Sequence, residues 1–268
     1  MEIIKTTLPG YPDAALEITL KSGVYDGWCR NTRPMMVIFP GGGYSFCSDR
    51  EAETIAAVYL AKGFSTCILR YSVRKSDDEP ALGDLPLQEA AGTVRYVREH
   101  AAEWSVDPEK ITVIGFSAGG HLAASLGVHW NDPDRIPIAG EAVKPNGLIL
   151  SYPVITAGSV THRGSIENLT GVNGYSEKDA LYDISRYVSP DTPPAFLWHT
   201  YEDEVVPVEN SLTMAMAMRK AGRNVSLHIF PEGEHGLSLA APEVGGGPED
   251  VRKWVELSVD WLKAMELM

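Results

Sequence analysis

Cysteine is scarce in this sequence, and no metal-binding pattern compensates for it. The three cysteines, Cys29, Cys47 and Cys67, are an odd number and show no C-x-x-C spacing. This argues against both a disulfide framework and a thiolate zinc site, so we interpret them as small buried hydrophobic residues. No H-E-x-x-H motif or comparable cluster of histidine and aspartate occurs. We therefore expect neither a metal nor another cofactor.

Long apolar runs and an excess of positive charge are also missing. No stretch approaches the roughly 18 consecutive apolar residues of a membrane-spanning helix, and residues 1–16 lack the pattern of a secretory signal. The formal net charge of -13 repels nucleic-acid phosphates and anionic membranes. We expect a cytoplasmic protein that binds neither nucleic acid nor membranes and takes a neutral small molecule. A homodimer formed through exposed strand or helix edges is left open.

Apolar runs bounded by turn residues alternate with amphipathic stretches along the chain. This alternation predicts an α/β fold with a mostly parallel central sheet flanked by helices, and 268 residues suit a single domain over 1–268. Ser48 and Glu51 match a capping box before a helix that Gly63 ends. Residues 153–193 do not alternate cleanly, and we expect an excursion over the sheet or a small cap there. The predicted strands are 16–21, 35–39, 65–71, 111–114, 147–152, 194–199 and 225–230, and further helices are predicted at about 84–102, 118–129, 208–221 and 248–264.

A short apolar strand runs directly into Gly-Phe-Ser-Ala-Gly at residues 115–119 and then into an apolar helix. This context predicts a nucleophile elbow, a tight turn that holds the Ser117 hydroxyl clear of the sheet. The turn leaves no room for side chains beside the serine, which explains Gly115 and Gly119. The helix behind it directs its positive end at the charge that develops during attack. Ser117 is therefore the predicted nucleophile.

A serine nucleophile needs a base and an orienting carboxylate, expected in the chain order Ser, Asp, His. The acidic loop after strand 194–199 offers Asp203, with Glu202 and Glu204 as rivals, at the end of a strand where catalytic groups gather. His235 lies in the loop after the next strand, and of the seven histidines it alone meets this topological requirement. We predict a triad in which Asp203 fixes the tautomer of His235 and stabilises its imidazolium.

Three glycines after an early strand, at residues 41–43, allow backbone amides to face a ligand. The predicted donors to a tetrahedral oxyanion are the amides of Gly42, Gly43 and Ala118. A phosphate loop is disfavoured because no Gly-Lys-Ser/Thr follows, while a plain flexible turn is left open. Three aromatic residues beside these loops are candidates for a sugar-binding platform or for core filling: Tyr44, Trp198 and Tyr201.

Five segments together resemble the α/β-hydrolase superfamily, and within it the small esterases related to the hormone-sensitive-lipase group and to bacterial acetyl and acetylxylan esterases. They are PGGGY at 40–44, SDRE at 48–51, GFSAGGH at 115–121, HTYEDEVVPVENS at 199–211 and FPEGEHG at 230–236. The resemblance runs from about residue 35 to the C-terminus and implies the residue roles given above. Two features depart from that group: Pro40 stands where it usually has histidine, and its long N-terminal helical cap is missing.

The resemblance implies carboxylic ester hydrolysis through an acyl-enzyme. Little or no cap suggests an open site that favours short acyl groups on bulky alcohols, so acetylated xylo-oligosaccharides are the expected substrates. One alternative is a serine peptidase of the prolyl-oligopeptidase kind, which shares the triad order but generally carries a propeller domain that these residues do not contain. The other is a non-catalytic binding protein with a hydrolase fold, although such descendants usually lose a triad member.

Overall fold

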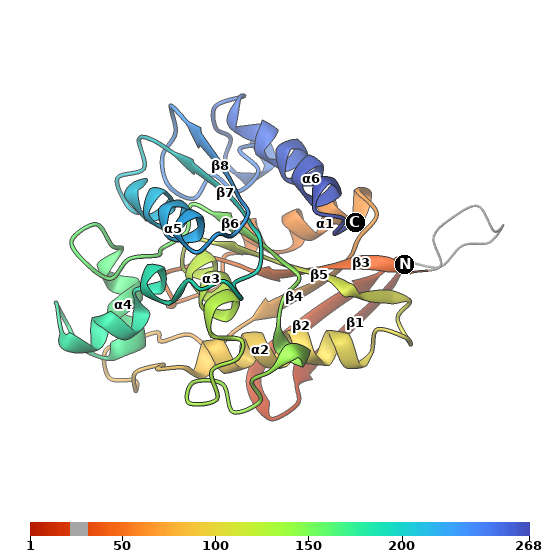
Figure 1. Ribbon diagram of the computed structural model, residues 1–268, viewed down its shortest axis with the longest axis horizontal. Helices are drawn as coiled ribbons and strands as arrows, with labels where there is room; N and C mark the ends of the chain where they lie inside the picture. Colours follow the sequence, from red (N-terminus) through yellow and green to blue (C-terminus); the bar gives the residue numbers. More distant parts are fainter. Residues whose placement is uncertain (22–31) are drawn as a thin grey trace.

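An eight-stranded sheet forms the centre of the computed structural model, which describes residues 1–21 and 32–268 (Figure 1). The strands lie side by side in the order β1-β2-β4-β3-β5-β6-β7-β8. β1 pairs antiparallel with β2, and β2 with β4, whereas β3 to β8 are parallel to one another. This mostly parallel sheet confirms the predicted fold class. The strands are β1 (Glu2–Leu8), β2 (Tyr11–Leu20), β3 (Arg33–Phe39), β4 (Ser65–Arg70), β5 (Val106–Phe116), β6 (Gly147–Ser151), β7 (Ala195–Thr200) and β8 (Val225–Phe230).

Helices cover both faces of the sheet, as crossover connections between parallel strands require (Figure 1). Their buried apolar side chains form two clusters, one on each face. Val94, Leu122 and Met214 represent the cluster under α2, α3 and α5, and Ile55 and Trp254 represent the cluster under α1 and α6. The helices are α1 (Glu53–Ala61), α2 (Leu85–Glu99), α3 (Ala118–His129), α4 (Arg163–Thr170), α5 (Glu209–Lys220) and α6 (Trp254–Ala264).

The seven predicted strands are all present, whereas β1 has no counterpart in the prediction. Of its residues only Leu8 is buried, so no apolar run marks this edge strand. Its position comes instead from backbone pairing with β2, which runs in register from Glu2 opposite Leu20 to Thr7 opposite Ala15 and shifts before Leu8, which lies opposite Tyr11. Whether such an edge segment forms a strand depends more on pairing with its neighbour than on its own side chains.

The predicted capping box at Ser48 does not form. Ser48 is extended and its side chain makes no cap, a 3-10 turn covers Asp49–Glu51, and α1 begins only at Glu53. The Glu51 carboxylate turns into the protein and accepts hydrogen bonds there, so it is not available to the backbone amide of Ser48. Gly63, with a φ of 103°, does follow the end of α1 as expected.

Residues 153–193 form an excursion between β6 and β7 that contains α4 and two 3-10 turns, Glu177–Tyr182 and Ile184–Tyr187. Asn210 on α5 holds the first part of this excursion in place. Its side-chain oxygen accepts hydrogen bonds from two backbone amides of the excursion, and its side-chain nitrogen donates to a backbone carbonyl there. α4 then docks on the glycine loop, where Asn168 Nδ2 donates to the Gly43 carbonyl at 2.9 Å. The excursion is thereby held against the loop predicted to bind the oxyanion.

The remaining expectations concern cysteine, metals and membranes. Cys47 and Cys67 are free, and burial raises the pKa of each thiol to about 12, which fits small hydrophobic side chains. Cys29 lies outside the described residues. Within residues 1–21 and 32–268, no three side chains of histidine, cysteine, aspartate or glutamate converge as metal ligands, and no helix has the length and apolarity to cross a bilayer.

Candidate active site

The serine elbow lies at the carboxyl end of β5, where the strand passes into α3. Ser117 has a φ of 53°, which non-glycine residues rarely adopt. A Cβ on Gly115 would lie 2.0 Å from the Gly119 carbonyl oxygen, and a Cβ on Gly119 would lie 2.1 Å from the Phe39 carbonyl oxygen. Neither glycine can be replaced without moving backbone, so the sharp turn that exposes Ser117 depends on both.

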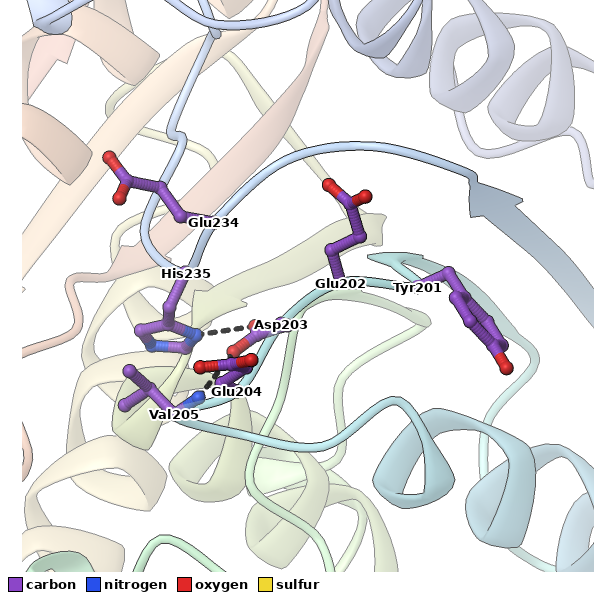
Figure 2. A pocket seen from close by; sticks show the side chains of 7 residues that line it. All are labelled: Tyr201, Glu202, Asp203, Glu204, Val205, Glu234 and His235. Carbon is purple, nitrogen blue, oxygen red and sulfur yellow. Dashed lines mark hydrogen bonds and ion pairs between the residues drawn. The ribbon is translucent and has the colours of Figure 1, made fainter.

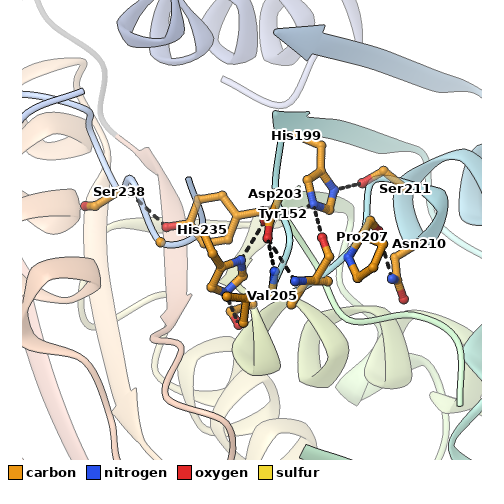
Figure 3. A network of polar contacts seen from close by, with 12 residues as sticks. Tyr152, His199, Asp203, Val205, Pro207, Asn210, Ser211, His235 and Ser238 are labelled. Atoms are coloured by element: carbon orange, nitrogen blue, oxygen red, sulfur yellow. Dashed lines mark hydrogen bonds and ion pairs between the residues drawn. The ribbon is translucent and has the colours of Figure 1, made fainter. Parts of the chain in front are cut away.

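Loops that follow three different strands bring Ser117, His235 and Asp203 together. His235 Nε2 lies 2.8 Å from Ser117 Oγ. On the other side of the ring, His235 Nδ1 lies 2.6 Å from Asp203 Oδ2, as Figure 3 shows. Since an ionised carboxylate only accepts hydrogen bonds, Nδ1 donates to Asp203, and Nε2 is left to accept the serine proton. The three residues predicted as nucleophile, base and acid thus form one hydrogen-bonded chain.

Asp203 is buried, and every one of its acceptor positions is used. Oδ1 accepts from the amides of Val205 and Val206 at 3.0 and 2.8 Å, and Oδ2 accepts from His235 and His199. Burial alone raises the pKa of Asp203, but hydrogen bonds from His199 and His235 outweigh burial and hold the pKa well below its usual range. The carboxylate therefore stays ionised and can stabilise a positive charge on His235.

An acidic rim surrounds this buried carboxylate (Figure 2). Glu202, Glu204 and Glu234 are exposed around a hollow that Tyr201 also lines. The Glu202 carboxylate accepts from the Gly233 amide, and neither rival of Asp203 bonds to the imidazole. An anion that approaches this side meets charge of its own sign, so the rim disfavours anionic substrates.

A second histidine, His199, completes the surroundings of Asp203 and is absent from the predicted site. Its ring is buried at the end of β7, with Nε2 2.9 Å from the Val206 carbonyl oxygen and 3.2 Å from Asp203 Oδ2 (Figure 3). Because a carbonyl only accepts, Nε2 carries the proton and Nδ1 accepts from the Ser211 hydroxyl. His199 thus anchors the far side of the carboxylate. Its position at a strand end gives no sequence signal that separates this role from core packing.

A buried glutamate supports the glycine loop, which the sequence does not reveal. The Gly41 amide donates to Glu51 Oε2 at 2.8 Å, and the Tyr152 hydroxyl donates to Glu51 Oε1 at 2.5 Å. The Ser238 amide in turn donates to the Tyr152 hydroxyl at 2.9 Å. Burial raises the pKa of Glu51, and the hydrogen bonds from Tyr152 and Gly41 oppose that rise. Since Ser238 follows His235 closely in the chain, this network joins the glycine loop to the histidine loop.

The backbone amides predicted as oxyanion donors are available beside Ser117. Gly42 and Gly43, with φ of 128° and 62°, line the same cleft of about 430 Å³ as Ser117 and His235. Their amides have no acceptor within the described part of the chain. Ala118 begins α3, so its amide has no partner inside the helix either.

Two of the three aromatic residues considered for a sugar platform fill the core instead. Tyr44 is 1% exposed and its hydroxyl bonds to His121 Nδ1, while Trp198 is 0% exposed and stacks on Trp254. Neither ring has a face left for a substrate, so the platform interpretation is wrong for both and the core-filling alternative holds. Tyr201 is 71% exposed on the acidic hollow, and its role in substrate binding stays a prediction.

The parallel sheet and its serine elbow define an α/β hydrolase. The chain belongs to the BD-FAE family, whose model matches residues 28–218. This match includes the glycine loop, the elbow and the loop of Asp203, and it ends before His235.

Similar proteins include both curated relatives and solved structures. The chain is 38% identical over 220 residues to "Endo-1,4-beta-xylanase B" of Butyrivibrio fibrisolvens, which covers 80% of this chain and 34% of that protein. It is 34% identical over 206 residues to "Acetylxylan esterase" of Xylanibacter ruminicola, which covers 75% of this chain and 40% of that protein. The chain therefore spans about a third to two fifths of these relatives' length. The carboxylesterase Cest-2923 from Lactobacillus plantarum shares the fold with a TM-score of 0.89 and 28% identity, over 100% of this chain and 99% of that one.

Proposed function

We propose that the protein is a carboxylic ester hydrolase that works through an acyl-enzyme and removes acetyl groups from xylo-oligosaccharides. The observation that carries this proposal is the hydrogen-bonded chain from Ser117 through His235 to Asp203, open to a cleft at its serine end. A hydroxyl, an imidazole and a buried carboxylate in this order form the arrangement that activates a serine for acyl transfer.

In the first half-reaction, Ser117 Oγ attacks the ester carbonyl carbon while His235 Nε2 takes the hydroxyl proton. The negative charge that develops on the carbonyl oxygen is stabilised by the amides of Gly42, Gly43 and Ala118. One such donor is typically worth about 3 kcal/mol in the transition state. When the intermediate collapses, the bond to the alcohol oxygen breaks and His235 gives its proton to that oxygen, which leaves an acetyl-serine.

In the second half-reaction, water replaces the alcohol. His235 Nε2 takes a proton from the water, whose oxygen attacks the acetyl carbonyl carbon, and the same amides stabilise the second oxyanion. Collapse breaks the bond to Ser117 Oγ, His235 returns the proton to that oxygen, and acetic acid leaves. Asp203 stabilises the imidazolium in both halves because its low pKa keeps the carboxylate charged.

The lining of the cleft favours a short acyl group. Of its twelve lining residues, only Phe46 and Val205 carry apolar side chains, and both are largely exposed. A long acyl chain needs a continuous apolar wall, because each buried CH₂ contributes about 0.8 kcal/mol only where it leaves water. An acetyl group needs little of that surface.

The alcohol side favours an uncharged molecule rich in oxygen atoms. Arg50 lines the cleft and donates one hydrogen bond, to the Gly236 carbonyl, and no carboxylate in the described residues pairs with it. Its other N–H groups can donate to hydroxyl or ring oxygens. The acidic rim disfavours anions, and the name of the Xylanibacter relative points to acetylated xylan as the source of such an alcohol.

A panel of p-nitrophenyl esters from acetate to decanoate, assayed beside acetylated xylo-oligosaccharides, tests the proposal. We expect the highest kcat/KM at acetate and release of acetic acid from the oligosaccharides. A maximum at long chains would overturn the acetyl preference. Hydrolysis of p-nitrophenyl acetate without release of acetic acid from the oligosaccharides would support the esterase activity and refute the proposed sugar substrate.

A further inference from the structure

A histidine from the excursion lines the cleft that contains the serine. His162 precedes α4 and lines the same cleft as Ser117 and His235. Its Cε1 would lie 3.4 Å from a Cβ built on Gly43, so the ring packs directly on the glycine loop. Asn168 holds α4 on that loop through the Gly43 carbonyl, so the ring stands on a fixed support.

Hydrogen bonds to one side of this ring decide where its proton lies. His162 is the N-cap of α4, and its Nδ1 accepts from the Ser165 amide at 3.3 Å. The Ser165 hydroxyl lies 2.8 Å from the same nitrogen. A backbone amide can only donate, so Nδ1 must present its lone pair. A neutral imidazole that accepts at Nδ1 carries its proton on Nε2.

The opposite nitrogen, Nε2, is a free donor on a residue that lines the cleft. In the part of the chain that the structure describes, Nε2 has no hydrogen-bond partner, and it is not among the buried polar atoms left unsatisfied. Burial lowers the pKa of His162, and the nearby His235 lowers it further. The ring is therefore neutral at pH 7 and offers a single N–H.

We propose that His162 donates its Nε2–H to an oxygen of the alcohol half of the substrate, next to the scissile ester, and so selects hydroxylated alcohols over plain ones. The inference rests on the proposed esterase function and specifies what that site recognises. The oxyanion amides already serve the acyl carbonyl, and an acetyl group has no other acceptor. Arg50 lines the same cleft and uses one N–H group on the Gly236 carbonyl, so its remaining N–H groups are a second set of donors for a hydroxylated alcohol.

Two esters of nearly equal shape isolate this contact: 2-hydroxyethyl acetate and propyl acetate, which differ by a hydroxyl in place of a methyl group. Asparagine is a good N-cap, so Oδ1 in His162→Asn keeps an acceptor for the Ser165 amide, while the side-chain NH₂ group takes the place of the ring Cδ2 and leaves no donor at the Nε2 position. We expect the ratio of kcat/KM for the hydroxylated ester to that for the plain ester to fall roughly five- to tenfold, as the loss of one neutral hydrogen bond implies.

His100→Asn is the matched control, because His100 packs on Tyr96 and Trp104 outside the cleft, and it should leave the ratio unchanged. An unchanged ratio in His162→Asn, including an equal loss on both esters, would refute the inference and leave the esterase standing. If the wild type cleaved neither ester, the proposed function would fail and the inference with it.

Nitrogen NMR of the uniformly labelled wild-type protein gives a readout independent of turnover. We expect the His162 proton on Nε2, with Nδ1 in the unprotonated form. A proton on Nδ1 would overturn the proposal whatever the activities are.

Discussion

Replacing Glu51 with glutamine tests how the glycine loop is held. The carboxylate presents one oxygen to the Gly41 amide and the other to the Tyr152 hydroxyl, and both of those groups donate. A glutamine amide has one oxygen and one NH₂ group, so it must turn the NH₂ group toward one donor. The Tyr152 hydroxyl cannot simply reverse, because it already accepts from the Ser238 amide and its own proton would lose its acceptor.

The magnitude follows from that single mismatch. A buried donor left without an acceptor costs about 1–3 kcal/mol, so the free energy of unfolding should fall by that amount. Complete loss of one oxyanion donor typically costs a factor of about 10²–10³ in kcat. Because Glu51 holds the loop and does not itself contact the oxyanion, we expect a loss of roughly 10–100-fold in kcat with KM changed less than about threefold.

The assay is steady-state hydrolysis of p-nitrophenyl acetate, with urea unfolding of the same preparation. Glu53→Gln is the matched control, since Glu53 lies two residues on, is half exposed and pairs with Arg70 at the surface. Exposed ion pairs contribute little to stability, so the free energy of unfolding of this variant should stay within about 0.5 kcal/mol of the wild type and its kcat within about twofold. A Glu51→Gln protein that is destabilised but keeps kcat within about threefold would refute the idea that Glu51 positions the loop for catalysis.

Four further outcomes follow from the structure. Asp203→Asn should lower kcat roughly 10³–10⁴-fold on p-nitrophenyl acetate, because the amide favours the wrong tautomer of His235, and a loss below tenfold would contradict this. Gly119→Ala should destabilise the protein by more than about 2 kcal/mol in urea unfolding, because its Cβ would lie 2.1 Å from the Phe39 carbonyl oxygen. Burial lowers the pKa of His121 to about 4 from 6.5, so as the pH falls the unfolded state binds a proton before the folded state does. Urea unfolding should therefore show the free energy of unfolding decreasing by up to about 3 kcal/mol between pH 7 and pH 4, and this decrease should be smaller in His121→Asn. Tyr201→Ala should raise KM for acetylated xylo-oligosaccharides about fivefold if its exposed ring binds sugar, and an unchanged KM would remove that role.

Most of the sheet could be predicted because its strands are buried on both faces and appear as apolar runs. The predicted strand 111–114 and the glycines after it, Gly115 and Gly119, identified the elbow, since a tight turn at that position tolerates no side chain at either glycine. Chain order then separated His235 from the other histidines. These features are local or depend only on the order of elements, which is why the sequence alone reveals them.

The features that could not be predicted depend on contacts between distant segments. Glu51 matched a helix cap in sequence, yet its carboxylate is bound by groups 10 and 101 residues away. His162 lies at an ordinary helix start, and only the folded chain brings its ring to the glycine loop. His199 is only four residues from Asp203, but a strand end gives no signal that its ring turns toward the carboxylate. Tyr44 and Trp198 lie next to the correct loops, but their side chains point into the core. Proximity in sequence predicts the neighbourhood of a side chain and not its direction.

The most direct test of the central claim is covalent labelling with a fluorophosphonate, followed by mass spectrometry of the labelled peptide. We expect stoichiometric modification at Ser117 in the wild type, much slower labelling in His235→Asn and none in Ser117→Ala. Labelling at another serine, or no labelling of the folded wild-type protein, would contradict the claim that Ser117 is an activated nucleophile.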